Sequence, residues 1–131
     1  MRKFTLLSFL FLASMLFAQV TTVPGIVQKG YKGEVTIVFN PTQGNKGMVN
    51  AKQCFAHTGI TYNGKSWQNT SSWRDGEDKY KMTKNADGSW ELKITPNIYA
   101  YYGVPESTEV TQLCFVFNDG PSGNLEGKAD G

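Results

Sequence analysis

Apolar and polar residues alternate over short stretches of this chain, and nowhere do apolar residues recur with sustained helical spacing. The alternation is clearest along Glu34–Phe39 and along Trp90–Ile94, and it is typical of strands with one buried face. From residue 19 onward the chain has nine valines, five isoleucines and eleven threonines, only three leucines, and all 14 glycines. Such a composition favours pleated structure interrupted by turns. The sequence therefore predicts an all-β domain.

The N-terminal residues have the three parts of a secretory signal peptide. Arg2 and Lys3 precede an apolar run over residues 4–17, and Ala18 is a small residue at a plausible cleavage edge. The run is shorter than the ~20 apolar residues that a membrane span needs. We expect residues 1–18 to be removed and the remainder to be exported to the periplasm, the cell surface or the medium, with no membrane attachment.

The predicted mature domain, residues 19–131, carries no net charge. The whole chain has 13 basic and 11 acidic side chains, and the two surplus positive charges, Arg2 and Lys3, belong to the predicted signal peptide. A surface that binds duplex nucleic acid needs several uncompensated lysines or arginines to neutralise phosphates. The charge balance therefore argues against nucleic acid and acidic membranes as partners, and it favours an uncharged ligand.

Turn residues divide the domain into about six short predicted strands, as in a β-sandwich of immunoglobulin-like size. Residues 19–27 predict an edge strand interrupted at Pro24-Gly25, because proline cannot donate a hydrogen bond to the ladder. Residues 80–84 and 89–95 predict a hairpin, and the alternation places Trp90 in the core. We therefore predict an immunoglobulin-like β-sandwich.

The C-terminal part predicts that this sandwich is incomplete. Val110–Asn118 is the most apolar segment, which indicates a central strand, whereas residues 119–131 are polar and Gly-rich with no strand pattern. A central strand needs a partner on each side, and an open edge invites pairing. We expect the domain to lack its last strand in this chain, which would be the N-terminal part of a longer protein.

Three further segments give weaker predictions. Residues 53–58 predict a core strand that stops at Gly59. Residues 59–79 are polar and long for a loop, so they are either functional or contain short strands. Residues 96–102 hold three tyrosines and predict a corner or loop rather than a helix.

Cys54 and Cys114 lie in predicted strands of an exported domain, where a disulfide can form. A bridge between them would close a loop of roughly 60 residues and stabilise the fold by about 4 kcal/mol on the chain-entropy model. The alternative is a pair of buried free thiols. The sequence leaves both possibilities open, and two cysteines alone do not make a structural zinc site.

Catalysis and metal chemistry find little support in the sequence. His57 is the one histidine, and no serine nucleophile or orienting acid lies in a context that would complete a triad with it. Asp75, Glu77 and Asp78 could offer oxygens to Ca²⁺, but such a run is more often a solvated loop. The chain contains no phosphate-binding loop and no HExxH motif. We predict no catalytic residues, no metal and no cofactor.

Aromatic and polar side chains gather where predicted strands end. His57 lies at the end of one strand, Trp67 and Trp73 follow in the polar stretch, and Asn118 and Asp119 end the central strand. A sugar presents C–H faces that pack on aromatic rings and hydroxyls that need donors and acceptors. These residue types favour a neutral polysaccharide as the ligand.

The order of these residues resembles that in the starch-binding modules of carbohydrate-binding families 25 and 26. Those modules carry His-Tyr-Gly at a strand end, then a Trp, a Met-containing strand and a strand ending Phe-Asn-Asp-Gly. The matching residues here are His57-Thr58-Gly59, Trp67, Met82 and Phe115–Gly120. The chain from about residue 20 also resembles N-terminal β-sandwich domains of secreted α-amylase-family proteins of Bacteroidetes. The resemblance implies that His57 and Trp67 contribute to an α-glucan platform and that Asn118 and Asp119 shape the adjacent turn.

The chain departs from that pattern after Gly120. The modules usually continue with Trp-Asp-Asn-Asn, whose Trp completes the stacking surface, whereas residues 121–125 contain no aromatic side chain. Trp73, Tyr62 or Tyr101 could replace it, or the affinity could be low, or the site could be lost. Thr58 also stands where the family often has tyrosine.

We therefore expect non-catalytic binding of starch or another α-glucan by ring stacking. Such binding would concentrate substrate for a covalently linked, amylase-type catalytic domain. One alternative is a structural spacer, in which His57 is a structural histidine and Trp67 and Trp73 pack against a neighbouring domain or cap the sandwich. A stand-alone hydrolase is a further alternative, but it requires a catalytic constellation that the sequence does not offer.

Overall fold

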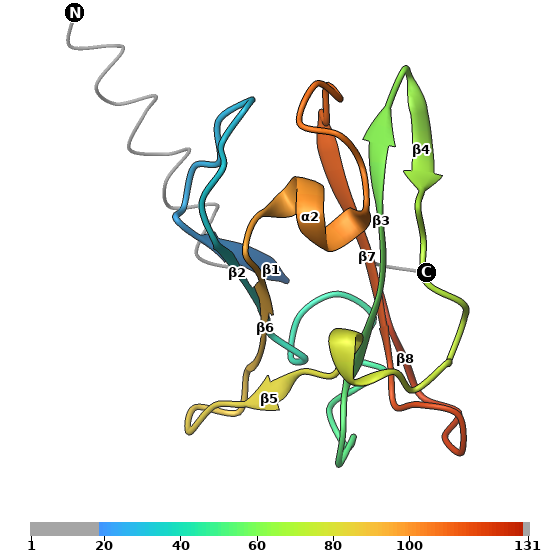
Figure 1. Cartoon of the computed structure of the whole chain (residues 1–131). Coiled ribbons are helices and arrows are strands. Elements are labelled where there is room, and N and C mark those ends of the chain that lie inside the picture. The colour runs from blue at the N-terminus through green and yellow to red at the C-terminus, as the bar shows by residue number, and fades with distance from the viewer. Residues whose placement is uncertain (1–18, 130–131) are drawn as a thin grey trace, which may run out of the picture.

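In the computed structural model, which describes residues 19–129, two four-stranded antiparallel sheets face each other (Figure 1). Sheet A has the order β1 (Val20–Val23), β2 (Val35–Phe39), β6 (Trp90–Ile94) and β5 (Thr83–Lys84). Sheet B has the order β4 (Lys65–Gln68), β3 (Phe55–Tyr62), β7 (Gln112–Asn118) and β8 (Glu126–Gly127). The predicted all-β sandwich is confirmed, and the predicted signal peptide lies outside the described residues. Within residues 19–129, no helix is long and apolar enough to cross a membrane.

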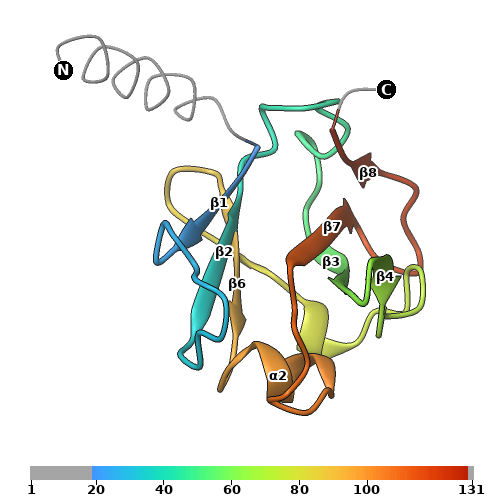
Figure 2. The same ribbon diagram turned by 90° about the horizontal axis from the view of Figure 1, so that it is seen from above.

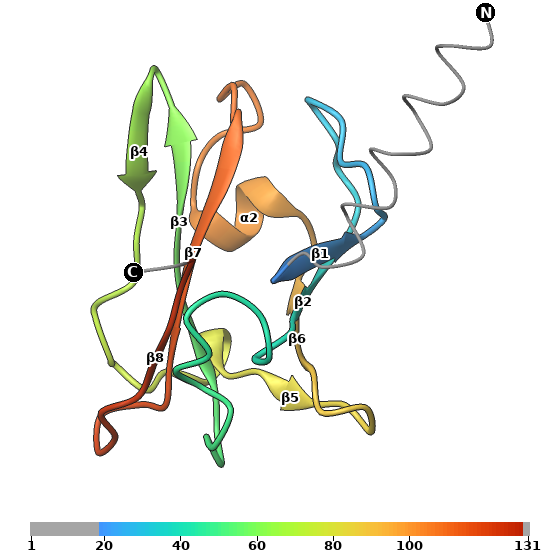
Figure 3. The same ribbon diagram turned by 180° about the vertical axis from the view of Figure 1, so that it is seen from behind.

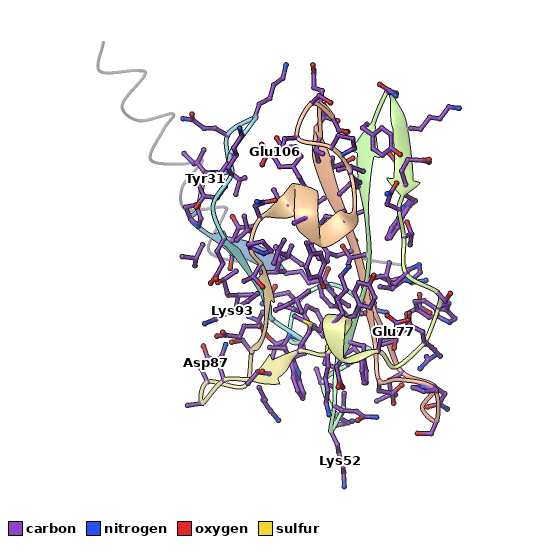
Figure 4. All side chains as sticks on the ribbon, in the orientation of Figure 1. Tyr31, Lys52, Glu77, Asp87, Lys93 and Glu106 are labelled. Carbon is purple, nitrogen blue, oxygen red and sulfur yellow. The ribbon has the colours of Figure 1, made fainter. Side chains whose placement is uncertain are left out.

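The core forms where the alternating strands turn their apolar faces toward each other, and side chains fill the space between the sheets (Figure 4). In β2 every second residue is fully buried, and β6 buries Trp90, Leu92 and Ile94 in the same way. The sheets meet at Phe39 of β2 and Phe117 of β7, whose rings stack with centroids 3.9 Å apart and planes inclined by 9°. The predicted hairpin and the core position of Trp90 are confirmed.

A short helix, α2 (Ile98–Tyr102), lies between the two sheets at one end of the sandwich (Figure 2). The prediction of a corner or loop here was wrong. Asn97 caps the helix by accepting a hydrogen bond from the Ala100 N–H at 2.9 Å, and Gly103 ends it in the left-handed conformation. The helix has five residues, which is too short for apolar periodicity to reveal it.

The strand predicted to stop at Gly59 continues to Tyr62, and the polar stretch after it contains β4 and a 3₁₀ turn, η1 (Asp78–Tyr80). Gly59 therefore lies inside β3. A side chain there would collide with the segment that follows β4, because an added Cβ would lie 2.2 Å from Thr70 Oγ1. Glycine marks a close backbone approach here rather than the end of a strand.

The C-terminal tail does contribute a strand, contrary to the prediction. β8 pairs with the last two residues of β7, Phe117 and Asn118. Gly127 lies directly over the core, since an added Cβ would come within 2.7 Å of Met48 and 2.8 Å of Phe39. The strand had no apolar pattern because it contacts the core through a glycine.

The two cysteines do not form the disulfide that the sequence left open. Both are buried free thiols, and they lie on opposite faces of sheet B. Cys54 packs in the core, with its sulfur 3.5 Å from that of Met82. Cys114 faces outward, with its sulfur 3.6 Å from Thr61 Oγ1, and it pairs with Gly59 in the β3–β7 ladder. Five residues of strand, at about 3.3 Å each, separate Cys54 from that pairing position, which is too far for a bridge.

We predict that Phe117→Ala lowers the free energy of unfolding by about 3–5 kcal/mol. The substitution removes the ring that joins the sheets and leaves a cavity against Phe39. Urea unfolding followed by circular dichroism measures the change. Val116→Ala, a truncation of a half-buried neighbour on the other face of β7, is the matched control. A similar loss in both variants would contradict the role given to the ring stack.

We also predict that a reducing agent leaves the thermal midpoint of the protein unchanged. Both thiols are free and buried, and burial raises the pKa of the Cys54 thiol far above its usual value, so neither reacts readily in the folded state. Alkylation in denaturant without reductant should label both cysteines, as mass spectrometry would show. An unlabelled pair that becomes reactive only after reduction would contradict the structure.

Candidate functional site

Strand β3 presents His57 on the outer face of sheet B. Its neighbour Thr58 points inward and is fully buried, with its hydroxyl 2.7 Å from the Tyr102 hydroxyl and donating to the Cys114 carbonyl at 2.8 Å. Because successive side chains of a strand point to opposite faces, the anchoring of Thr58 turns His57 outward. Thr58 thus fixes the orientation of the histidine beside it.

Two tryptophans lie against His57 and form with it the ring cluster (His57, Trp67 and Trp73). The imidazole stacks on Trp67 with centroids 5.5 Å apart and planes at 23°. It meets Trp73 edge to face, with centroids 5.0 Å apart and planes at 88°. Trp67 is 41% exposed and Trp73 is 45% exposed. Two large apolar rings are therefore held in contact with solvent on one side of the sandwich.

A β-bulge directs Trp67 toward the cluster. Ile60 pairs with Gln68 and Tyr62 pairs with Lys65, so β4 uses one more residue than β3 between these two pairs. The extra residue allows Trp67 to adopt φ 58°, in the left-handed region that a bulky side chain rarely enters. Bulges of this kind re-aim a side chain. The irregularity in β4 is what brings the indole over the imidazole.

Left-handed backbone recurs in the segment that carries the second tryptophan. Asn69 has φ 53° and Arg74 has φ 58°. With Trp67, three non-glycine residues in this stretch occupy a region that costs of order 1–3 kcal/mol each. Strain of this kind persists only where surrounding contacts enforce it, and it concentrates at functional sites.

The His57 ring is held neutral at pH 7 by its surroundings. Its Nδ1 lies 3.4 Å from the Ser71 hydroxyl. Burial lowers the pKa of the imidazole below the ordinary 6.5, and the charge of Asp75 and a hydrogen bond with the Ser72 backbone offset only part of that effect. A neutral ring can stack on Trp67 without a solvation penalty for charge. His57 therefore acts as an aromatic and hydrogen-bonding group rather than as a cation.

Arg74 ties the segment to the end of β7. Its guanidinium donates to Asp119 Oδ1 at 2.7 Å and to the Leu125 carbonyl at 2.7 Å, and both side chains of the ion pair are largely buried. The same guanidinium lies 5.3 Å from the centre of the Trp73 ring, a favourable cation–π distance. Arg74 thus fixes the position of Trp73, and no local pattern could have revealed it because its partner is 45 residues away.

The Asp119 carboxylate stabilises this arrangement at neutral pH. Partial burial raises its pKa, but hydrogen bonds from Arg74 and from the Leu125 N–H outweigh that effect and hold the pKa below its ordinary 3.8. A carboxyl whose pKa is lower in the folded state stabilises the fold above the unfolded pKa of about 3.9. That contribution is lost as the pH falls through the lowered value.

Of the five predicted site residues, three form the ring cluster, in which His57 contacts Trp67 and Trp73. Asn118 and Asp119 lie outside it. Asn118 is 1% exposed and its side-chain oxygen accepts from the Gly120 N–H at 2.9 Å, so it shapes the turn and cannot reach a ligand. Asp119 uses its Oδ1 for Arg74 and the Leu125 N–H. Both residues stabilise the turn that follows β7, which is the role that the resemblance implies for them.

Of the aromatic residues considered as a second stacking surface, only Trp73 joins the cluster. Tyr101 is 6% exposed, and its hydroxyl donates to the Lys79 carbonyl at 2.7 Å. Tyr62 packs partly against the core and donates to Asn69 Oδ1 at 2.9 Å. Trp73 is therefore the one of these three aromatic residues that contacts His57.

The ring cluster forms an open surface rather than an enclosed cavity. Because His57 is nearly parallel to Trp67 and nearly perpendicular to Trp73, the two indole planes are steeply inclined to each other. His57 covers one face of Trp67, so the exposure of that indole comes from its opposite face and edges. Within residues 19–129, no three His, Cys, Asp or Glu side chains could together hold a metal ion. The arrangement suits a ligand with apolar faces and a bend.

Comparison with known proteins adds no identification, since neither a protein-family model nor a curated protein matches the sequence.

We predict that NMR titration of the single histidine gives a pKa below 6.5, because burial disfavours the imidazolium. Asp75→Asn should lower the pKa further, since it removes a charge that favours protonation. Asp87→Asn, in the β5–β6 turn, is the control and should leave the pKa unchanged. A pKa at or above 6.5 in the unsubstituted protein would contradict the described environment of the ring.

Proposed function

We propose that this domain binds starch or a related α-glucan without catalysis, through the ring cluster. The observation that carries the proposal is the contact of His57 with two solvent-exposed indoles, Trp67 and Trp73. Large exposed aromatic rings on a small domain usually mark a binding surface. Trp67 itself and Arg74, the residue after Trp73, have left-handed backbone, a conformation that often occurs at functional sites.

The chemistry of the cluster fits an uncharged sugar. The open face of Trp67 offers a flat apolar surface for the C–H face of a glucose ring. His57, whose pKa is lowered by burial, packs on the other face of Trp67 and supports the indole without adding a charge to the cluster. The Ser71 hydroxyl, 3.4 Å from His57 Nδ1, is a hydrogen-bonding group beside the rings. The inclined plane of Trp73 favours a chain that curves, as α-linked glucans do, over a flat ribbon.

Charge also supports a neutral ligand. Arg74, the cation that lies over the Trp73 ring, is engaged by Asp119 and by two backbone carbonyls. It is therefore not available to an anionic ligand such as a phosphate. In this proposal the cluster recognises the shape and the apolar faces of its ligand rather than charge.

In a longer polypeptide, such a surface would increase the local concentration of substrate around a linked catalytic domain. We infer that the partner domain is a secreted, amylase-type hydrolase, on the basis of the resemblance described above. The binding domain itself contributes no reacting group in this proposal.

We predict that the purified protein co-sediments with insoluble starch and that Trp67→Ala weakens the retention at least about tenfold, as expected for a central aromatic contact. Trp73→Ala should weaken it less, because Arg74 already packs against that ring. Val49→Ala is the control, since Val49 is 49% exposed and lies outside the ring cluster. Circular dichroism confirms that each variant is folded.

If the folded protein is not retained on starch, and if maltooligosaccharides leave its tryptophan fluorescence unchanged, the proposal fails. The exposed indoles would then favour the alternative of a spacer domain whose rings pack against a neighbouring domain.

A further inference from the structure

The two long sides of the sandwich differ. On the side of β5, the sheets are joined: Phe55 forms a bridge with Lys81, and the Met82 N–H donates to the Cys54 carbonyl at 2.8 Å. On the opposite side, β1 and β7 lie at facing edges of the two sheets (Figure 3). A groove of about 640 Å³ separates them there. We call it the β1–β7 groove.

The β1–β7 groove is lined mainly by apolar side chains. One side of the groove is formed by Val20 and Val27, and the other side by Leu113 and Phe115. Ile98 of α2 lies at one end. Lys29 is the one charged residue of the lining, and it is paired with Glu109 at 3.0 Å. The groove therefore has no unpaired charge for an ionic ligand among its described residues.

On the β7 side of the groove, backbone N–H and C=O groups are not paired with another strand of the described residues. β7 pairs with β3 along its whole length on one edge. On its other edge, β8 pairs only with Phe117 and Asn118. Among residues 19–129, no strand pairs with Gln112–Val116 on that edge. This row of N–H and C=O groups is a template for an additional strand.

Burial along β7 follows the same boundary. Phe117, which β8 covers, is 1% exposed. Phe115 stacks on Phe117 with centroids 5.9 Å apart but is only partly buried, as is Leu113. The inward-facing side chain of β7 is therefore buried where β8 pairs with the strand, at Phe117, and only partly buried where β8 is absent, at Phe115 and Leu113.

The backbone after β8 already enters the gap between the two edges. The Lys128 carbonyl accepts from the Asn45 N–H at 3.0 Å and from Gln19 Nε2 at 2.9 Å. Gln19 immediately precedes β1. At Lys128 the chain thus lies between the end of β7 and the beginning of β1, and its direction is antiparallel to β7.

We propose that a further strand of the same polypeptide occupies the β1–β7 groove. This strand would continue β8, run antiparallel to β7 and carry apolar side chains at alternate positions. Its backbone would pair with Gln112–Val116, and its inward side chains would cover Leu113 and Phe115. The proposal rests on the unpaired edge, the apolar lining and the course of the chain at Lys128, and it is independent of glucan binding.

The test compares the full 131-residue chain with two extended forms. One carries, after a Gly-Ser spacer, six residues that alternate threonine and valine. The control extension replaces the central valine with proline, which cannot donate to a ladder. Hydrogen exchange of the β7 amides and the thermal midpoint are measured for all three chains.

The alternating extension should slow exchange within Gln112–Val116 at least about tenfold and raise the thermal midpoint by about 5 °C. The proline form should do neither. Leu113→Ser is made in both the unextended chain and the chain with the alternating extension. The extension should then raise the thermal midpoint by less than it does in the chain with Leu113, even if the substitution also destabilises the fold itself. Exchange that is unchanged by the extension, or slowed equally by both extensions, overturns the proposal. Concentration-dependent protection of these amides in the unextended chain would also overturn it, because a second copy would then be the occupant.

Discussion

The stack of Phe39 on Phe117 decides which side of each sheet is inside, and the remaining structure follows from it. Burial of Phe117 turns every second residue of β7 inward, including Phe115 at the groove. β7 pairs with β3 residue by residue, so the same choice turns Thr58 inward and His57 outward. One contact between two rings thus places the ring cluster on the outer face of sheet B and the apolar groove at its inner edge.

The outer surface depends in turn on contacts made by residues far apart in the sequence. Gly59 leaves room for the segment after β4 to pass close to β3. Arg74 then ties that segment to Asp119 and to the Leu125 carbonyl. These contacts stabilise backbone that would be unfavourable by itself. The positions of Trp67 and Trp73 are therefore set by contacts with the sandwich beneath them as well as by the loop that carries them.

Alternation predicted the strands well where one face is buried and the other is solvated, as in β2 and β6. It failed where another physical requirement selected the residue. Gly59 and Gly127 weakened the pattern of their strands because neighbouring atoms leave no room for a side chain. The helix α2 escaped prediction because two caps, Asn97 and Gly103, stabilise a segment too short to show a period.

The sequence by itself determined the alternation, the charge balance and the supply of aromatic side chains, because these are properties of local composition. It also named His57, Trp67 and Trp73 as candidates. Only the tertiary structure decided that these three rings touch, that Asn118 is buried and that the two cysteines lie on opposite faces of a sheet. Each of those outcomes depends on strand register and on a bulge, and register is set by contacts between residues that are distant along the chain.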